Sequence, residues 1–459
     1  MTRPEPPAAG AEDTAPSRAE IAAIEAAVDA EDGPALDALL EPMHAADIAD
    51  VIEQLTPPRR RALLRLYSGE IDGEILSEID EAIREEVIDA LPHEVVAEAV
   101  REMDSDDVVD LVEDLDAPGR EQILAHLDES DRVAVEQSLS WPEYSAGRLM
   151  QSEVVVAPEH WTVGEAIDHL RAEESLPDQF YHVILVDPRR HPIGYVTLGR
   201  ILSAQRDVRL TEIVEPSFRT IDADEDEGDV AYAFNQYHLI SAPVVDRDGR
   251  LVGVITIDDA MTVLDEEAEE DILRLAGVGE ESHVSDTGLQ TARRRLPWLA
   301  VNLFTASLSA IVISLFQDTI AALVTLAALM PIVASTGGIA GTQSLAVAVR
   351  ALATRDLTAH NARRVVLREL FAGFLNGLGL ALILGLGGMV IFGSAPLGLV
   401  LGSAMIVNQI VAALGGVLVP LALNRLGLDP ALASGTFVTT LTDVVGFFAF
   451  LGLATWILT

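Results

Sequence analysis

The spacing of apolar residues changes twice along the chain, which divides it into three parts. From Arg18 to about Ser140, apolar residues recur every three or four positions between Pro, Asp and Gly, and this predicts short amphipathic helices. From about residue 141 to 264 the spacing is that of strands alternating with helices. Beyond residue 295 come five long apolar stretches, each long enough to cross a bilayer.

The helical part contains an internal repeat. Asp47–Leu55 (DIADVIEQL) returns sixty residues later as Asp107–Leu115 (DVVDLVEDL), and Arg60 recurs as Arg120. Repeated amphipathic units bury their apolar faces against their neighbours. Residues 18–140 are therefore predicted to form an all-α helical solenoid. Its acidic residues are interpreted mainly as a solvated face, with cation binding as an alternative.

A second repeat occupies the part with strands and helices. His182–Asp187 and Ile193–Thr197 return, shifted by 59 residues, as Ser241–Asp246 and Val252–Thr256. A helical pattern precedes the strands in each copy. Two βαββα units packed as an α/β pair are the simplest interpretation.

These two units, residues 141–207 and 208–264, resemble tandem CBS domains, regulatory modules that often bind adenosine nucleotides. The resemblance implies that a Thr and an Asp three residues apart hold the ribose of ATP. Thr256 and Asp259 occupy these positions in the second copy, whereas Arg200 replaces the acid in the first. The resemblance thus implies a single nucleotide site, and an N-cap formed by Thr256 at the start of the next helix is the alternative.

An acid-dense helix follows the second unit. Eight carboxylates occur within fourteen residues, from Asp258 to Asp271. At this density they repel one another unless cations or basic groups screen them. Residues 265–295 are therefore interpreted as an acidic connecting helix and linker that acts as an ion-controlled joint and ends in Arg293–Arg295.

The membrane part, residues 296–459, is predicted to be an all-α domain with five spans. The predicted spans are Leu296–Phe316, Ile320–Val349, Leu370–Phe392, Pro396–Leu423 and Ala431–Leu458. Arginines precede the first span and occupy the connections after the second and fourth spans, whereas the other two connections contain no basic residue. Because basic residues favour the cytoplasmic side, the N-terminal half is predicted to be cytoplasmic and the C-terminus outside, in the plasma membrane.

A single carboxylate, Asp443, lies near the middle of the fifth span. A charge at that depth costs about 2.5–3.5 kcal/mol on insertion scales, so such residues usually face a bundle interior or a water-filled path. Thr436, Thr439 and Thr440 lie on the same face of the predicted helix. The sequence predicts a polar, cation-binding stripe, and neutralisation of Asp443 by a neighbouring helix is the alternative.

The second predicted span contains Pro331 and the small, polar run Ser335–Ser344 (STGGIAGTQS). We expect these residues to break the helix, because irregular backbone at membrane depth is tolerated where it lines a cavity. Close helix packing through the glycines of the run is the alternative.

Charge is divided unequally between the soluble and membrane parts. Residues from Leu296 onward contain six arginines and five acids, whereas the earlier residues contain 24 arginines and 68 acids, a net charge of −44. This makes nucleic-acid binding improbable and favours a cation partner or adaptation to a high-salt cytoplasm. The Pro- and acid-rich residues 1–17 are predicted to be a disordered tail, and no secretory signal peptide is recognised.

With these parts in order, the chain resembles the MgtE family of magnesium channels and transporters over nearly its whole length. The stretches that carry the resemblance are Pro142–Met150 (PEYSAGRLM), Gly249–Asp259 (GRLVGVITIDD), Pro331–Gln343, Arg350–Leu357 (RALATRDL), Asp429–Ser434 (DPALAS) and Thr442–Asp443.

The family resemblance implies a homodimer whose second and fifth spans line a pore. It implies that Asp443, with the nearby threonines, binds hydrated Mg²⁺, while acidic cytoplasmic domains sense Mg²⁺ and close the pore. The sensor residues that it implies are Asp259, Glu267, Glu270 and Asp271. The chain departs from the family pattern at Ile339, Gly435 and Asn235–His238, so part of the pore mouth and of the sensor is expected to differ.

The expected function is Mg²⁺ influx through a channel that closes when cytoplasmic Mg²⁺ is plentiful, with modulation by ATP. Mn²⁺ and Co²⁺ remain alternative ions. An ion-coupled divalent cation carrier or exporter and a membrane-tethered nucleotide sensor without transport are the competing functions. An enzyme is not expected, because the sequence contains no recognisable set of nucleophile, base and orienting group.

Overall fold

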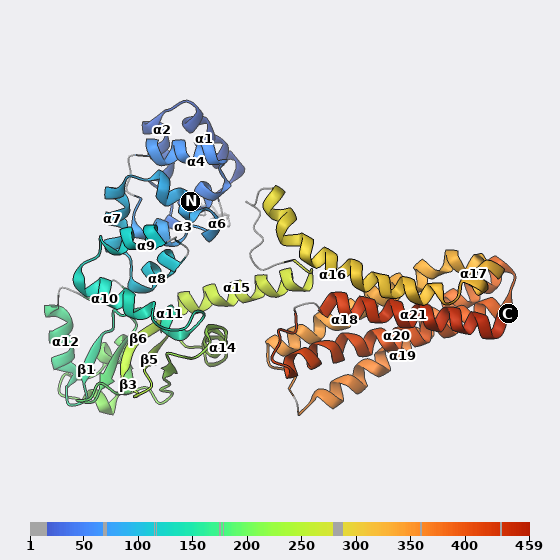
Figure 1. Cartoon of the computed structure of the whole chain (residues 1–459). Helices are drawn as coiled ribbons and strands as arrows, with labels where there is room; N and C mark the ends of the chain where they lie inside the picture. The colour runs from blue at the N-terminus through green and yellow to red at the C-terminus, as the bar shows by residue number, and fades with distance from the viewer. Residues whose placement is uncertain are drawn as a thin grey trace, which may run out of the picture. The chain divides into compact units, whose positions relative to one another are not determined.

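The computed structural model describes residues 16–67, 71–113, 115, 117–173, 176–177, 179–278, 288–358, 360–431 and 434–459. The first fifteen residues of the predicted tail and residues 279–287 of the predicted linker lie outside the described residues. The chain divides into two compact units, Met1–Asp265 and Glu266–Thr459 (Figure 1).

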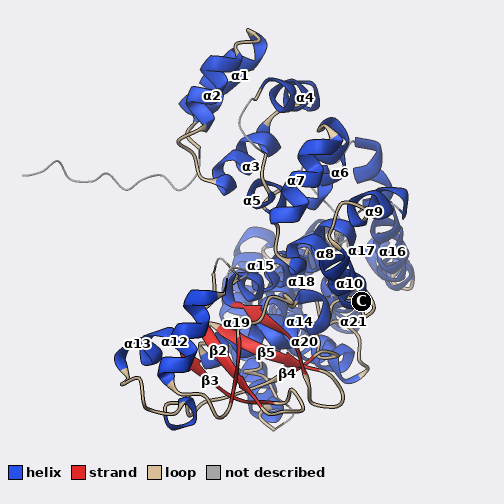
Figure 2. Cartoon of the chain, turned by 90° about the vertical axis from the view of Figure 1, so that its left-hand side faces the viewer, coloured by secondary structure: helices blue, strands red, loops and turns tan. Residues whose placement is uncertain are grey.

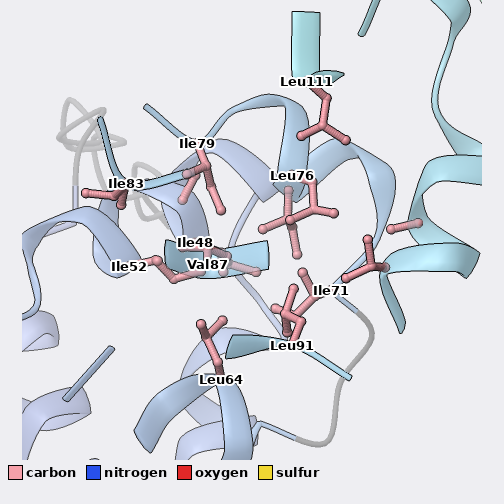
Figure 3. Close-up of a cluster of buried hydrophobic side chains, with 14 of the residues drawn as sticks. Ile48, Ile52, Leu64, Ile71, Leu76, Ile79, Ile83, Val87, Leu91 and Leu111 are labelled. Carbon is pink, nitrogen blue, oxygen red and sulfur yellow. The ribbon is translucent and has the colours of Figure 1, made fainter. Parts of the chain in front are cut away.

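The N-terminal part of the first unit is helical throughout its described residues. Its helices are α1 (Arg18–Asp29), α2 (Gly33–Leu40), α3 (Ala45–Gln54), α4 (Pro57–Leu66), α5 (Gly73–Ser77), α6 (Glu81–Ala90), α7 (His93–Glu102), α8 (Ser105–Glu113), α9 (Ala117–Leu124), α10 (Glu129–Ser138) and α11 (Ala146–Leu149). Successive helices share one core, in which Ile48 and Ile52 of α3 meet Leu76 of α5 and Val87 of α6 (Figure 3).

The sixty-residue repeat has a structural reason. The guanidinium Nε of Arg60 donates to the carbonyl oxygen of Ile52 at 2.9 Å, and Nε of Arg120 donates to the carbonyl oxygen of Val112 at 3.1 Å. Each arginine therefore satisfies a carbonyl near the end of the preceding repeat helix, where no intrahelical donor is available. This contact fixes the angle between consecutive helices in both copies.

The remainder of the first unit contains two three-stranded sheets (Figure 2). The first copy consists of β1 (Val156–Pro158), α12 (Val163–Ala172), β2 (His182–Val186), β3 (Pro192–Thr197) and α13 (Leu198–Ser203). The second consists of β4 (Ile221–Asp222), α14 (Glu227–Tyr237), β5 (Ser241–Val245), β6 (Leu251–Thr256) and α15 (Ile257–Leu275), with a short 3₁₀ helix, η1 (Leu210–Glu212), between the copies.

Both sheets have the same pairing, as the repeat predicts. The first strand of each copy runs parallel to the second, and the second runs antiparallel to the third. His182 and Ser241, which occupy equivalent positions in the two copies, form a hydrogen bond. Equivalent residues therefore meet at the contact between the two βαββα units, and the predicted α/β pair is confirmed.

Among its described residues, the second unit contains five helices long and apolar enough to cross a membrane. They are α16 (Gly288–Ser314), α18 (Thr325–Ala353), α19 (Ala362–Phe392), α20 (Ala395–Arg425) and α21 (Ser434–Leu458), and a short helix, α17 (Gln317–Ala322), connects the first two. The predicted five-helix membrane part is confirmed. Two of the helices begin before the predicted spans. Arg293–Arg295 lie in the first turns of α16 and Arg363–Arg368 in the first turns of α19, rather than in loops.

The predicted break in the second span is wrong. Helix α18 runs through Pro331 and the small, polar run without interruption, and its first residue is Thr325 rather than Ile320. The helix keeps its backbone groups bonded internally, which is the favoured solution in a membrane. The glycines serve close packing: a Cβ atom on Gly341 would approach Val438 of α21 to 2.6 Å, and one on Gly416 of α20 would approach the carbonyl oxygen of Gly341 to 2.7 Å.

Candidate functional site

Helix α21 carries a polar stripe along one side. Thr436, Thr440 and Asp443 are half-buried, and Thr439 is exposed. The hydroxyl of Thr440 donates to the carbonyl oxygen of Thr436 at 2.7 Å, so this threonine is satisfied within its own helix. In the described part of the chain, the carboxylate of Asp443 forms no hydrogen bond and no ion pair, and no arginine of a neighbouring helix neutralises it.

The stripe is held in position by the contact between α18 and α21. Val438 and Thr442 of α21 are fully buried, and the hydroxyl of Thr442 donates to the carbonyl oxygen of Thr439 at 2.8 Å. Gly338 of α18 faces Thr439, because a Cβ atom added to that glycine would lie 3.8 Å from the methyl carbon of the threonine. The buried positions of α21 thus fix its rotation, which leaves the neighbouring polar positions only partly covered.

An amide on α20 links the same helices. Asn408 is fully buried, and its Nδ2 donates to the carbonyl oxygen of Val333 on α18 at 2.8 Å. Gly337 of α18 and Gly446 of α21 make room for this side chain, since a Cβ atom on either glycine would lie against the amide. Among the described residues, the amide oxygen Oδ1 of Asn408 has no hydrogen-bond partner.

Asn408 lies within the fourth apolar span. Its spacing from Gly337 and Gly446 along the chain gives no sign that the three residues meet. Because a buried amide oxygen without a partner is costly, the side chain identifies a polar position inside the bundle that sequence reasoning had not assigned.

A group of aspartates lies in the first unit, where α8 meets the start of α15. Burial raises the pKa of Asp107 to about 7 and that of Asp259 to about 6, with the charges of nearby carboxylates as a further cause. Burial also raises the pKa of Asp106 well above its ordinary value, and the negative charge of Asp259 adds to this effect. In the part of the chain that the structure describes, the charged groups that most perturb these pKa values are all carboxylates.

Asp259 was assigned from the sequence to a nucleotide site and to an ion sensor. The structure places its carboxylate against Thr256, whose hydroxyl donates to Oδ2 of Asp259 at 2.6 Å and whose backbone N–H donates at 3.3 Å. These two bonds have the geometry of a helix cap. Asp106 and Asp107 were not among the predicted sensor residues, because about 150 residues separate them from Asp259 and no short-range pattern joins them.

The other predicted sensor residues lie further along α15, in the second unit. Arg274 contacts Glu270 of the same helix at 2.9 Å and Asp429, in the connection before α21, at 2.6 Å. Burial raises the pKa of Asp271, and the negative charge of Asp429 raises it further. Glu267 is exposed on the same helix. The structure therefore separates the predicted sensor into two places, Asp259 in the first unit and Glu267, Glu270 and Asp271 in the second.

The chemistry of the aspartate group in the first unit suits a hydrated divalent cation. Mg²⁺ prefers oxygen ligands, keeps several of its waters and needs only one or two carboxylates. Within the described ranges, no three carboxylate or imidazole side chains converge as a ready-made metal site. A hydrated cation beside these carboxylates would offset the repulsion between them.

Comparisons with known proteins cover both units. A family model described as a divalent cation transporter, MgtE, matches residues 330–453, and a model of the MgtE intracellular N domain matches residues 43–144. The CBS domain model matches residues 146–207 and 210–266.

Similar proteins include two curated transporters and a solved cytosolic domain. A magnesium transporter MgtE of Enterococcus faecalis is 35% identical over 324 residues, which cover 70% of each chain. One of Thermus thermophilus is 34% identical over 428 residues, which cover 92% of this chain and 94% of the relative. A similar solved structure is the crystal structure of the cytosolic domain of the Mg²⁺ channel MgtE in complex with ATP. Its sequence is 28% identical to this chain, its TM-score is 0.49, and the match covers 53% of this chain and 99% of that one. Because the identity to the Thermus relative extends over nearly the whole of both proteins, this chain belongs to the MgtE family of divalent cation transporters.

Proposed function

We propose that this chain forms a Mg²⁺-selective influx channel with Asp443 at the centre of its pore. The observation that carries the proposal is the half-buried carboxylate of Asp443, which has no hydrogen-bond or ion-pair partner among the described residues. An ionised carboxylate at membrane depth is expensive unless it faces a partner or water. A hydrated cation supplies both the charge and the water.

The partial exposure of the polar stripe favours a homodimer. Thr439 is exposed on α21, and Phe437 and Leu441 of the same helix are exposed as well. A second copy of the chain would cover this side and bring a second Asp443 to the opposite wall of the pore. Two carboxylates suffice to attract a divalent cation and to repel anions, as in other cation channels that use acidic rings.

The ion is proposed to be Mg²⁺ for reasons of chemistry and of family. Mg²⁺ loses its waters reluctantly, so a pore can select it through hydroxyls and carboxylates that contact its hydration shell. Thr436, Thr439 and Thr440 provide hydroxyl and carbonyl oxygens beside Asp443. The curated relatives that match are named as magnesium transporters.

Cytoplasmic Mg²⁺ is proposed to close the pore through the acidic groups of α15. An ion bound by Asp106, Asp107 and Asp259 would favour the arrangement in which α8 and the start of α15 lie together. A second ion near Glu267, Glu270 and Asp271 would act on the other half of the same helix. A ligand that binds one arrangement more tightly shifts the population toward it, and this makes the acidic helix an ion-dependent gate.

The chain is a multi-pass membrane protein with a soluble N-terminal part. Its orientation is proposed from the arginines. Arg350 lies near the end of α18, Arg364 near the start of α19 and Arg425 at the end of α20. In five spans that alternate in direction, these ends lie on the same side of the membrane as the start of α16, which follows the soluble part. With these arginines in the cytoplasm, the C-terminus lies outside the cell. The CBS pair is proposed to bind ATP near Thr256 and Asp259. Binding there would require rearrangement of the hydrogen bonds that the hydroxyl and the backbone N–H of Thr256 now donate to the carboxylate of Asp259.

The test is Mg²⁺ uptake into vesicles that contain the full-length protein. Asp443→Asn is expected to abolish uptake while membrane insertion persists, because it removes the charge at the centre of the stripe. Asp318→Asn is the matched control, since Asp318 is exposed at the start of α17 and should leave most of the uptake intact. Uptake by Asp443→Asn at the rate of the unchanged protein would reject the pore.

The same vesicles distinguish the competing functions. Currents far above the turnover of a carrier support a channel, whereas uptake that depends on a coupled ion gradient supports a carrier or exporter. Absence of flux in the unchanged protein, with retained nucleotide binding, supports a membrane-tethered sensor. Varying internal Mg²⁺ and ATP independently tests gating by each ligand.

A further inference from the structure

A cavity lies beside the connection between α18 and α19 in the second unit. Its volume is about 680 Å³, and it is enclosed by the last turns of α18, the connection itself, the first turns of α19 and Val417 of α20. The site residues discussed above take no part in it. Both helices that form it continue as apolar spans, so the cavity lies where the hydrocarbon layer ends.

Three arginines line this cavity: Arg350 at the end of α18, and Arg364 and Arg368 in the first turns of α19. Arg368 contacts Glu369 at 3.2 Å, and this carboxylate also accepts a hydrogen bond from Ser344 at 3.3 Å. The guanidinium groups of Arg350 and Arg364 form no hydrogen bond or ion pair with any residue that the structure describes. Asp356 also lines the cavity, and its carboxylate accepts a hydrogen bond from the hydroxyl of Thr354 at 3.1 Å. Three arginines and two carboxylates therefore line the cavity, which leaves its lining with a net positive charge.

The rest of the lining is suited to a molecule with an apolar part. Val347 and Ala348 of α18, Val365 of α19 and Val417 of α20 form an apolar wall. On the polar side, Nδ2 of Asn361 donates to the carbonyl oxygen of Asp356 at 2.6 Å, and the backbone N–H groups of Arg364 and Val365 donate to the carbonyl oxygen of Asn361. The arginine side chains are therefore the groups of this lining that are available to an anion. The cavity thus combines an anion-binding side with an apolar side.

We propose that this cavity binds the phosphodiester headgroup of an anionic phospholipid. Arg350 and Arg364 hold the phosphate oxygens, and the valines contact the glycerol and the first methylene groups. Basic pockets between membrane helices at the cytoplasmic surface have this kind of specificity. A soluble phosphate ion would use the arginines but would leave the apolar wall uncovered, which is why the lipid is the favoured source of the phosphate.

Binding at this position connects two spans. Arg350 belongs to α18, the helix that packs against the polar stripe, and Arg364 belongs to α19, whose main contacts are with α20. A lipid that bridges the two arginines stabilises the arrangement of these helices by mass action. Anionic lipid is therefore expected to raise the melting temperature of the protein, independently of whether the pore conducts Mg²⁺.

The experiment uses the full-length protein, delipidated in a neutral detergent, and three probes: phosphatidylglycerol, phosphatidylcholine and inorganic phosphate. Lipid retention is measured by native mass spectrometry, and the melting temperature is measured in parallel. The double variant R350Q/R364Q removes the two unpaired charges. The matched control is R363Q/R425Q, because Arg363 and Arg425 are exposed at the ends of α19 and α20 and do not line the cavity.

We expect phosphatidylglycerol to bind and to stabilise both the unchanged protein and the control. R350Q/R364Q should bind it about 10- to 30-fold more weakly, as expected for two arginines that each contribute about 1 kcal/mol at a membrane surface. The charge-preserving variant R350K/R364K should retain most of the binding, which separates loss of charge from loss of folding.

Three results would overturn the proposal. Equal retention of phosphatidylglycerol by R350Q/R364Q and the control would mean that the lipid binds elsewhere. Equal stabilisation by phosphatidylcholine would remove the requirement for an anionic headgroup. Stabilisation by inorganic phosphate as large as that by phosphatidylglycerol would assign the arginines to a soluble anion instead of a lipid.

Discussion

Replacement of Asp107 by Asn tests the electrostatic argument at the junction of α8 and α15. The pKa of Asp107 is raised from 3.8 to about 7, mainly by burial and then by the charge of Asp259. The folded protein therefore holds this proton more tightly than the unfolded chain does. The sign follows from linkage: the contribution of Asp107 to stability is greatest at low pH, declines as the pH rises from about 4 to about 7, and leaves a destabilising charge above that range.

The size of the effect follows from the same pKa. A change from 3.8 to about 7 corresponds to about 4 kcal/mol if one carboxylate carries all of it. Asp106 and Asp259 share the repulsion, so a single substitution relieves only part of it. We expect Asp107→Asn to raise the free energy of unfolding by about 1–3 kcal/mol near pH 8 in the absence of Mg²⁺.

The assay is thermal unfolding of the full-length protein near pH 5 and near pH 8, with a chelator or with Mg²⁺. For a unit of this size, each kcal/mol changes the melting temperature by roughly 2–4 °C. Asp107→Asn should melt at a higher temperature than the unchanged protein near pH 8 with chelator, and by a smaller margin near pH 5, where only part of the stability has been lost. Mg²⁺ should stabilise the unchanged protein more than the variant, because the variant has lost a ligand and a repelling charge.

The matched control is Asp89→Asn, which removes an exposed carboxylate from α6. It should follow the unchanged protein at both pH values and in both media. The reasoning is refuted if Asp107→Asn gives no gain in stability over the unchanged protein near pH 8, or if Mg²⁺ stabilises the two proteins equally.

Two further predictions concern packing and an ion pair in the second unit. Gly337→Ala should lower stability by about 1–3 kcal/mol, because the added methyl group overlaps the buried amide of Asn408. The control is Gly379→Ala, whose added methyl group meets no atom within 4 Å and should be nearly neutral. Thermal unfolding in detergent compares the two variants. Arg274→Gln should lower stability by about 1–3 kcal/mol, because it leaves the partly buried Asp429 without its cation. Arg274→Lys should restore much of this loss, and equal melting temperatures for the Gln variant and the unchanged protein would show that the ion pair contributes nothing.

Properties that depend on residues close in sequence were predictable. Membrane spans follow from the length of each apolar stretch, and the prominence of Asp443 follows from one charge within such a stretch. The two βαββα units follow from the repeat, in which the same two strand patterns, each copy preceded by a helical pattern, return after 59 residues. The fold class required only these local patterns, and the structure confirms it.

Features that depend on contacts between distant residues were missed or were predicted wrongly. A proline and several glycines in the second span are compatible both with a broken helix and with a continuous, closely packed one. The choice depends on what the neighbouring helices present: Asn408 fits against Gly337, and Val438 fits against Gly341, so the continuous helix is favoured. Side-chain volumes on other helices decided this, and they leave no mark on the sequence of α18.

The sequence by itself determined which segments enter the membrane, which repeats pair and where a lone charge must be accommodated, because each is a property of a single segment. Only the tertiary structure decided which carboxylates act together. It joined Asp259 to Asp106 and Asp107 in one unit and connected Glu270 to Asp429 through Arg274 in the other. Electrostatic interaction depends on distance in space and on burial, and neither quantity is defined until the chain has folded.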